Sequence, residues 1–218
     1  MAKKRKFYVV WEGREPGIYE DWEDVRDQVE GFPGAKFKSF DSQTAATIAY
    51  RGNYADEASI IEAIAAHRGS REAAEELLFD HPEINPDAIA VDGACAGNPG
   101  VMEYRGVKVN TNEEIFHVGP LADGTNNVAE YLALVHALAL LYRNGDGVTP
   151  VYSDSRTARS WIKKRGHRSK LERTSFNGKI FEMLQRADIW LHTHTFTNPV
   201  LRWDTDRWGE IPADFGRK

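Results

Sequence analysis

Three acidic residues in this 218-residue chain stand where a metal-dependent reaction would need them. Asp92 closes a short apolar stretch and precedes a glycine-rich turn, which predicts a carboxylate at the end of a buried strand. Asp154 follows a second apolar stretch in the same way. Glu130 is the only charged residue of an otherwise apolar predicted helix over residues 127–141. Because burying an unpaired carboxylate is costly, we expect a cation beside Glu130.

A fourth carboxylate, Asp214, follows near the end of the sequence. Four carboxylates without cysteine or clustered histidine would make an oxygen-rich site, which suits Mg²⁺ or Mn²⁺ and disfavours zinc. Two such ions, ~3.5–4 Å apart, can activate a water and stabilise the leaving oxygen of an in-line phosphodiester displacement. Each aspartate alone is explained as well by a helix cap or a turn. Glu130 inside an apolar helix has no such explanation.

The elements around these acids predict an α/β fold for residues 87–218. Three strands, the last two joined by a short turn, precede an alternation of strands and helices, which is typical of a mixed sheet flanked by helices. The first predicted strand ends at Asp92, and the others cover 104–109, 114–118, 151–154 and 200–203. The predicted helices cover 127–141, 155–164 and 176–187.

Two further segments precede this domain. Residues 1–50 are aromatic-rich and predict a small α+β domain of ββαβα order, with helices over 22–30 and 42–50. Residues 51–86 carry many acidic side chains among alanines and end in a turn-rich stretch, which predicts a connector of one or two solvated helices.

The composition is that of a soluble globular protein, with 41% hydrophobic and 28% charged residues. Cys95 is the only cysteine and cannot form an internal disulfide, which fits a reducing compartment. No apolar run is long enough for a signal peptide or a membrane span. We therefore expect a cytoplasmic protein with no membrane contact and no obligate protein partner. The basic residues 3–6 are interpreted as a solvated tail rather than a targeting signal.

The net charge of −5 does not indicate a nucleic-acid binder, but its distribution is uneven. Basic residues concentrate in residues 161–173, whereas acidic residues dominate 54–83. A clustered basic surface can bind phosphates on an acidic protein, because electrostatic attraction is local at physiological salt. The alternative is a solvated helix end.

Three segments resemble the signature motifs of type 1 ribonuclease H: Asp92–Gly100, Thr125–Glu130 and Tyr152–Ser155. The resemblance implies the ribonuclease H-like fold, a five-stranded mixed sheet flanked by helices, over residues 88–218. It also implies hydrolysis of the RNA strand of RNA/DNA hybrids, leaving a 3′-hydroxyl and a 5′-phosphate. The catalytic and metal-binding positions of the family match Asp92, Glu130, Asp154 and Asp214.

The same resemblance implies a substrate groove lined by Asn98, Thr125, Asn126 and Asn127. Amides there can bond a 2′-hydroxyl, which distinguishes RNA from DNA, and Thr125 can contact a DNA phosphate.

The N-terminal segment resembles the viroplasmin-like hybrid-binding domain found in many such enzymes. Its contact positions match Tyr8, Trp22, Phe37 and Lys38, and Ser39 stands where a second lysine is common. The alternative is that Trp22 and Phe37 form the core of a very small domain.

One position departs from the family pattern, which places a histidine in a mobile loop before the last acid. Residues 203–210 contain none. Asp204 stands at the aligned position, and Glu210 is the alternative accessory group. The rival function is therefore a catalytically weak or inactive hybrid-binding protein, although all four acids are present. An integrase or junction nuclease that shares the fold is disfavoured by the motifs.

Overall fold

The structure of the chain is a computed structural model that describes residues 6–52 and 57–216. The basic residues 3–5 lie outside this description. The chain divides into two compact units, Met1–Gly69 and Ser70–Lys218. Each unit is described by itself.

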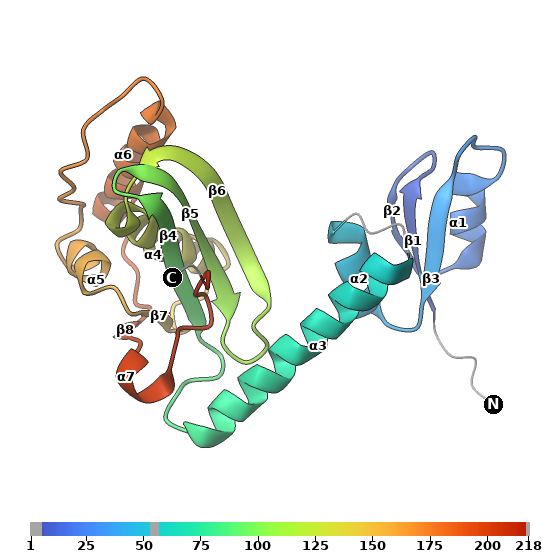
Figure 1. Cartoon of the computed structure of the whole chain (residues 1–218), viewed down its shortest axis with the longest axis horizontal. Helices are drawn as coiled ribbons and strands as arrows, with labels where there is room; N and C mark the ends of the chain where they lie inside the picture. Colours follow the sequence, from blue (N-terminus) through green and yellow to red (C-terminus); the bar gives the residue numbers. More distant parts are fainter. Residues whose placement is uncertain (1–5, 53–56, 217–218) are drawn as a thin grey trace. The chain divides into compact units, whose positions relative to one another are not determined.

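The first unit holds a three-stranded antiparallel sheet of order β2-β1-β3 (Figure 1). Its elements follow the predicted ββαβα order: β1 (Phe7–Glu12), β2 (Gly17–Tyr19), α1 (Trp22–Val29), β3 (Lys36–Phe40) and α2 (Gln43–Arg51). Helix α2 begins after Ser42, whose hydroxyl accepts a hydrogen bond from the Ala45 amide at 3.2 Å. A small core between β1, β3 and α2 includes Val9, Trp11, Phe40, Ala46 and Ala49.

The acidic segment forms one helix, α3 (Glu57–Asp80). Ile64 in its first half packs on the core of the first unit. Leu77 and Leu78 near its end pack on a core of the second unit. A helix is thus what the sequence predicted for this segment, while its role as a connector stays a prediction.

The second unit is built on a five-stranded mixed sheet of order β6-β5-β4-β7-β8. The first three strands pair antiparallel and the last two join in parallel. The strands are β4 (Ile89–Gly97), β5 (Gly100–Lys108), β6 (Glu114–Gly124), β7 (Val151–Ser153) and β8 (Val200–Arg202). The helices are α4 (Asn126–Arg143), α5 (Arg156–Lys163), α6 (Gly178–Thr193) and α7 (Thr205–Trp208). The predicted α/β fold is therefore confirmed.

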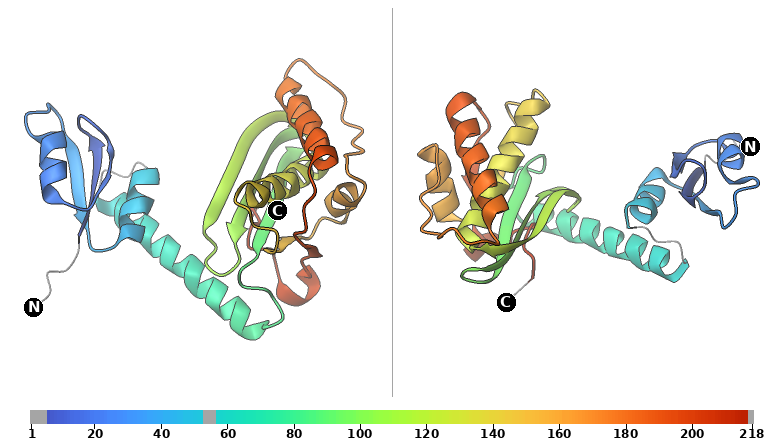
Figure 2. Two further views of the ribbon diagram at one scale, coloured as in Figure 1. Left: turned by 180° about the vertical axis from the view of Figure 1, so that it is seen from behind. Right: turned by 90° about the horizontal axis from the view of Figure 1, so that it is seen from above.

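Helices α4, α5 and α6 lie on one side of this sheet (Figure 2). Ile89 and Val91 of β4 pack with them in the larger core. Ala90 points to the opposite face, where it packs with Tyr152 and Trp203 in a second core. Because both faces of β4 are covered here, residues 89–91 are apolar without alternation.

The prediction that this strand ends at Asp92 is wrong. Strand β4 continues to Gly97 and turns directly into β5, with which it pairs along its whole length. The small residues 93–96, which directly follow Asp92, remain in the strand. The chain reverses only at Gly97, where φ is 105°. A β carbon on Gly100 would lie 1.9 Å from the Ala96 carbonyl oxygen, so this reversal requires glycine. Asp92 is therefore held in the middle of a strand.

Among the described residues, no helix is both long and apolar enough to cross a membrane.

Candidate functional site

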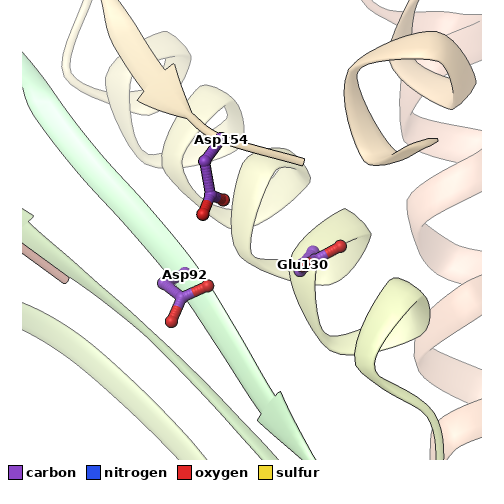
Figure 3. Close-up of side chains that lie close together, drawn as sticks. All are labelled: Asp92, Glu130 and Asp154. Carbon is purple, nitrogen blue, oxygen red and sulfur yellow. The ribbon is translucent and has the colours of Figure 1, made fainter. Parts of the chain in front are cut away.

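Asp92, Glu130 and Asp154 lie close together in the second unit (Figure 3). One carboxylate oxygen from each lies within 4.8 Å of the others. Strands β4 and β7 run parallel with Ala90 opposite Tyr152, and each aspartate follows its paired residue by two positions. The register of two neighbouring strands therefore places the two aspartates side by side.

Gly93 allows Glu130 to join them. A β carbon at this position would lie 2.5 Å from the Glu130 amide nitrogen and 2.6 Å from the Ala129 β carbon. Helix α4 therefore packs directly on the backbone of β4, next to Asp92. Any larger side chain at position 93 would push the helix and its carboxylate away.

Asp214 lines the same cavity, of about 430 Å³, as the other three acids. It lies on an irregular segment and not on a helix. The buried side chains of Ile211 and Ala213 anchor this segment in the second core. The fourth predicted acid is thus placed at the site, although it lies outside the three-carboxylate cluster.

Burial and mutual repulsion make these carboxylates weak acids. Burial, followed by the charge of Asp154, raises the pKa of Asp92 to about 8. Burial raises the pKa of Glu130 to about 7, against the lowering effect of a hydrogen bond from Ser155. The pKa of Asp154 is also raised, mainly by burial. Such a cluster keeps its full negative charge at neutral pH only if a cation joins it.

The donor atoms fit a hard divalent cation. The Oδ1 atom of Asp154 is buried and has no hydrogen-bond partner, which is the state expected of a ligand atom. Cys95 also lines the cavity, but burial raises the pKa of its thiol, and its Sγ lies 3.4 Å from the Gly124 carbonyl oxygen. The thiol therefore serves packing, and the atoms of this cavity that could hold a hard cation are carboxylate oxygens.

Two neighbours hold the Glu130 carboxylate in place. Asn126 donates from Nδ2 to Oε1 at 2.8 Å, and the Ser155 hydroxyl donates to Oε2. The same hydroxyl accepts a hydrogen bond from the Ala158 amide at 3.1 Å and so caps α5. Sequence reasoning assigned Asn126 to the substrate and gave Ser155 no role. The four-residue spacing of Asn126 and Glu130 on one helix was the available signal.

Three of the predicted groove residues, Asn98, Thr125 and Asn127, line a second pocket, of about 620 Å³. Arg168 and Lys170 of the basic segment line the same pocket. Polar amides, a hydroxyl and two cations therefore share one surface.

Arg165, also in the basic segment, is engaged elsewhere. Its Nη1 donates to the carbonyl oxygens of Leu191 and His194, the latter at 3.2 Å. Arg165 is itself exposed, but its side chain anchors the end of α6, whereas no side-chain bond is described for the exposed residues Lys163, Lys164, Arg168 and Lys170.

On the first unit, three predicted contact residues form one aromatic row. The ring centroids of Tyr8 and Trp22 lie 5.7 Å apart, as do those of Trp22 and Phe37. Trp22 is 46% exposed and Phe37 is 42% exposed, so the alternative that they form the domain core is wrong. Lys38 follows Phe37 on strand β3.

The two accessory candidates differ in their surroundings. Asp204 stands directly before α7 without a side-chain hydrogen bond to the helix, and it pairs with Arg202, with 3.3 Å between Oδ1 and Nη2. The charge of Glu210 instead contributes to the raised pKa of Asp154. Burial is the largest cause of that shift and the charge of Glu210 the smallest, so the choice between Asp204 and Glu210 stays a prediction.

Comparison with known proteins identifies the family to which the chain belongs. A family model described as RNase H matches residues 86–201, and one described as the ribonuclease H1 N-terminal domain matches residues 6–50. Since the first covers more than half of the sequence, the chain belongs to the ribonuclease H family. It is an enzyme of that family, whose members depend on a metal.

Individual relatives cover both parts of the chain. The ribonuclease H of Neorickettsia sennetsu is 33% identical over 147 residues, which are 60% of this chain and 89% of that protein. The ribonuclease H of Schizosaccharomyces pombe is 49% identical over 45 residues, 21% of this chain and 17% of that protein. Among solved structures, RNase H1 from Halobacterium salinarum is 22% identical, with a TM-score of 0.35 over 56% of this chain and 89% of that one.

Proposed function

We propose that the chain hydrolyses the RNA strand of RNA/DNA hybrids with two Mg²⁺ ions, for which Mn²⁺ can substitute, and leaves 3′-hydroxyl and 5′-phosphate ends. The observation that carries this proposal is the cluster of Asp92, Glu130 and Asp154, whose oxygens lie within 4.8 Å of one another, with Asp214 in the same cavity.

The four carboxylates would hold the ions, which supply an activated water and stabilise the leaving oxygen. The surrounding residues orient these ligands. Asn126 and Ser155 fix both oxygens of Glu130. The parallel register of β4 and β7 sets the spacing of Asp92 and Asp154. Rigid support of this kind keeps the ligands in productive geometry without rearrangement during the reaction.

The second pocket supplies a way to recognise a hybrid. The amides of Asn98 and Asn127 can bond 2′-hydroxyls of the RNA strand, and Thr125, with the cations of Arg168 and Lys170, can contact phosphates of the DNA strand. We assign a second binding surface to the first unit, where the aromatic row of Tyr8, Trp22 and Phe37 would pack against the nucleic acid and the Lys38 ammonium would contact a phosphate.

An assay with end-labelled duplexes tests the proposal. Cleavage is expected in the RNA strand of an RNA/DNA hybrid, with Mg²⁺, and not in RNA/RNA or DNA/DNA duplexes of the same sequence. The products should accept ligation through their 5′-phosphates. Tight hybrid binding without cleavage at any Mg²⁺ or Mn²⁺ concentration would instead support the rival, an inactive binding protein.

Neutralising the exposed basic side chains should weaken hybrid binding and its dependence on salt. The changes are Lys163→Gln, Lys164→Gln, Arg168→Gln and Lys170→Gln. Each lost phosphate contact should reduce the slope of log K against log salt by ~0.7–0.9, because fewer counterions are released. KM should rise while kcat changes little.

Arg165→Gln is the matched control for this set. Because Arg165 bonds backbone carbonyls, its loss should lower the melting temperature without changing the salt slope. An unchanged slope in the fourfold variant would mean that the basic segment is a solvated helix end.

The accessory carboxylates can be separated by kinetics. Glu210→Gln should slow steady-state turnover several-fold, whereas Asp204→Asn should have a smaller effect because Asp204 pairs with Arg202. Direct proton transfer would make the loss ~10²–10⁴-fold in single-turnover rates as well. Wild-type rates in both variants would show that the four acids suffice unaided.

A further inference from the structure

Arg105 of strand β5 binds the segment that carries Asp214. Its Nε donates to the Ala213 carbonyl oxygen at 2.8 Å, and its Nη2 donates to the carbonyl oxygen of Asp214 itself. The guanidinium also lies over the Phe215 ring, 4.8 Å from its centroid. One side chain therefore contacts three consecutive residues.

The strand register puts Arg105 beside the cluster. It is the cross-strand partner of Asp92 on one side and of His117 on the other. The His117 ring lies 5.7 Å from the Phe215 ring, and its Nε2 is 2.7 Å from Oε2 of the buried Glu103. The Phe215 ring thus lies against two side chains of the sheet, the Arg105 guanidinium and the His117 ring.

The packing of Ile211 and Ala213 holds this segment in the second core, but no regular element carries Asp214 itself. Locally, its amide donates to the Ile211 carbonyl oxygen at 2.8 Å, and its Oδ2 accepts from the Gly216 amide at 2.7 Å. Both bonds lie within the irregular segment and cannot tie it to the strand that holds Asp92. Among the bonds described for this segment, those of Arg105 join Asp214 to the sheet.

We propose that Arg105 is a positioning residue that holds Asp214 against the other three carboxylates and so sets the affinity of the site for divalent cations. This inference rests on the proposed function, because it takes Asp214 as a metal ligand. Arg105 itself would touch neither the ion nor the substrate.

Arg105→Met removes the donors while keeping an extended apolar side chain, and Lys108→Met on the same strand is the matched control. Lys108 pairs with Glu113 and has no described contact with residues 213–215. In the Arg105 variant, kcat should fall ~10²-fold, the loss that follows a misplacement of about 1 Å. The Mg²⁺ dissociation constant from calorimetry should rise about tenfold, while metal-free hybrid binding stays within about twofold. The control should match the wild type.

A double-mutant cycle with Asp214→Asn separates positioning from general destabilisation. If Arg105 acts through Asp214, Arg105→Met should add little to the loss caused by Asp214→Asn. Additive losses, or unchanged kcat and Mg²⁺ affinity in a folded Arg105→Met protein, would overturn the proposal. If that variant does not fold, Arg105→Lys takes its place, since it keeps the cation and loses the paired donors. An inactive wild type would refute the proposed function, while calorimetry would still test Arg105.

Discussion

Asp92→Asn should reduce hybrid cleavage by ~10²–10³-fold or more, the loss that follows removal of one group that stabilises the transition state. Asp92 lies on β4, with Glu130 on the neighbouring helix α4 and Asp154 directly after the neighbouring strand β7. An amide of the same shape removes one negative charge from the metal-binding set and leaves the groove residues unchanged. The dissociation constant for the hybrid without metal should therefore remain close to that of the wild type.

Asp87→Asn is the matched control for this experiment. Asp87 is exposed and precedes β4, so the same chemical change occurs five residues away and outside the cavity. Cleavage rates in Mg²⁺ and metal-free hybrid binding should be measured for both variants. If Asp92→Asn kept most of the wild-type turnover, the assignment of the carboxylate cluster as the metal site would be wrong.

Without metal, the protein should become less stable as the pH rises from about 5 to 9, and Asp92→Asn should remove much of this loss. The folded-state pKa is about 8 for Asp92 and about 7 for Glu130, whereas unfolded carboxyl groups titrate near ~4. Between these values the folded state binds more protons than the unfolded state, so the free energy of unfolding falls with increasing pH. The contribution of Asp92 is on the order of a few kcal/mol.

Urea unfolding in EDTA at pH 5 and pH 9 measures this effect. At pH 9 Asp92→Asn should be more stable than the wild type, and at pH 5 the two should be nearly equal. Adding Mg²⁺ should stabilise the wild type at pH 9 much more than the variant, because a bound cation offsets the repulsion among the carboxylates. A wild-type protein whose metal-free stability does not fall with pH would show that the acids are not buried together.

The chemistry of the site was readable in the sequence because it depends on residue type. Glu130 is a single carboxylate in an apolar helix, and Asp92 and Asp154 each follow an apolar stretch. A carboxylate in such surroundings is expected to be buried, and because burial is costly it needs a partner, whichever residues it contacts. The order of strands and helices was likewise predictable from hydrophobic periodicity. Periodicity did not predict the aromatic row of the first unit, because it cannot tell an exposed Trp22 from a core one; only the family resemblance pointed to these residues.

Long-range register and packing decided the rest. Strand β4 passes through Asp92 because β5 supplies hydrogen-bond partners to a run of small residues that reads locally as a turn. Ser155 reaches Glu130 across 25 positions in sequence, and Arg105 reaches Asp214 across 109. The sequence around Ser155 or Arg105 does not indicate these contacts, because each residue bonds a partner that lies far away in the sequence. Only the folded sheet brings those partners within hydrogen-bond distance.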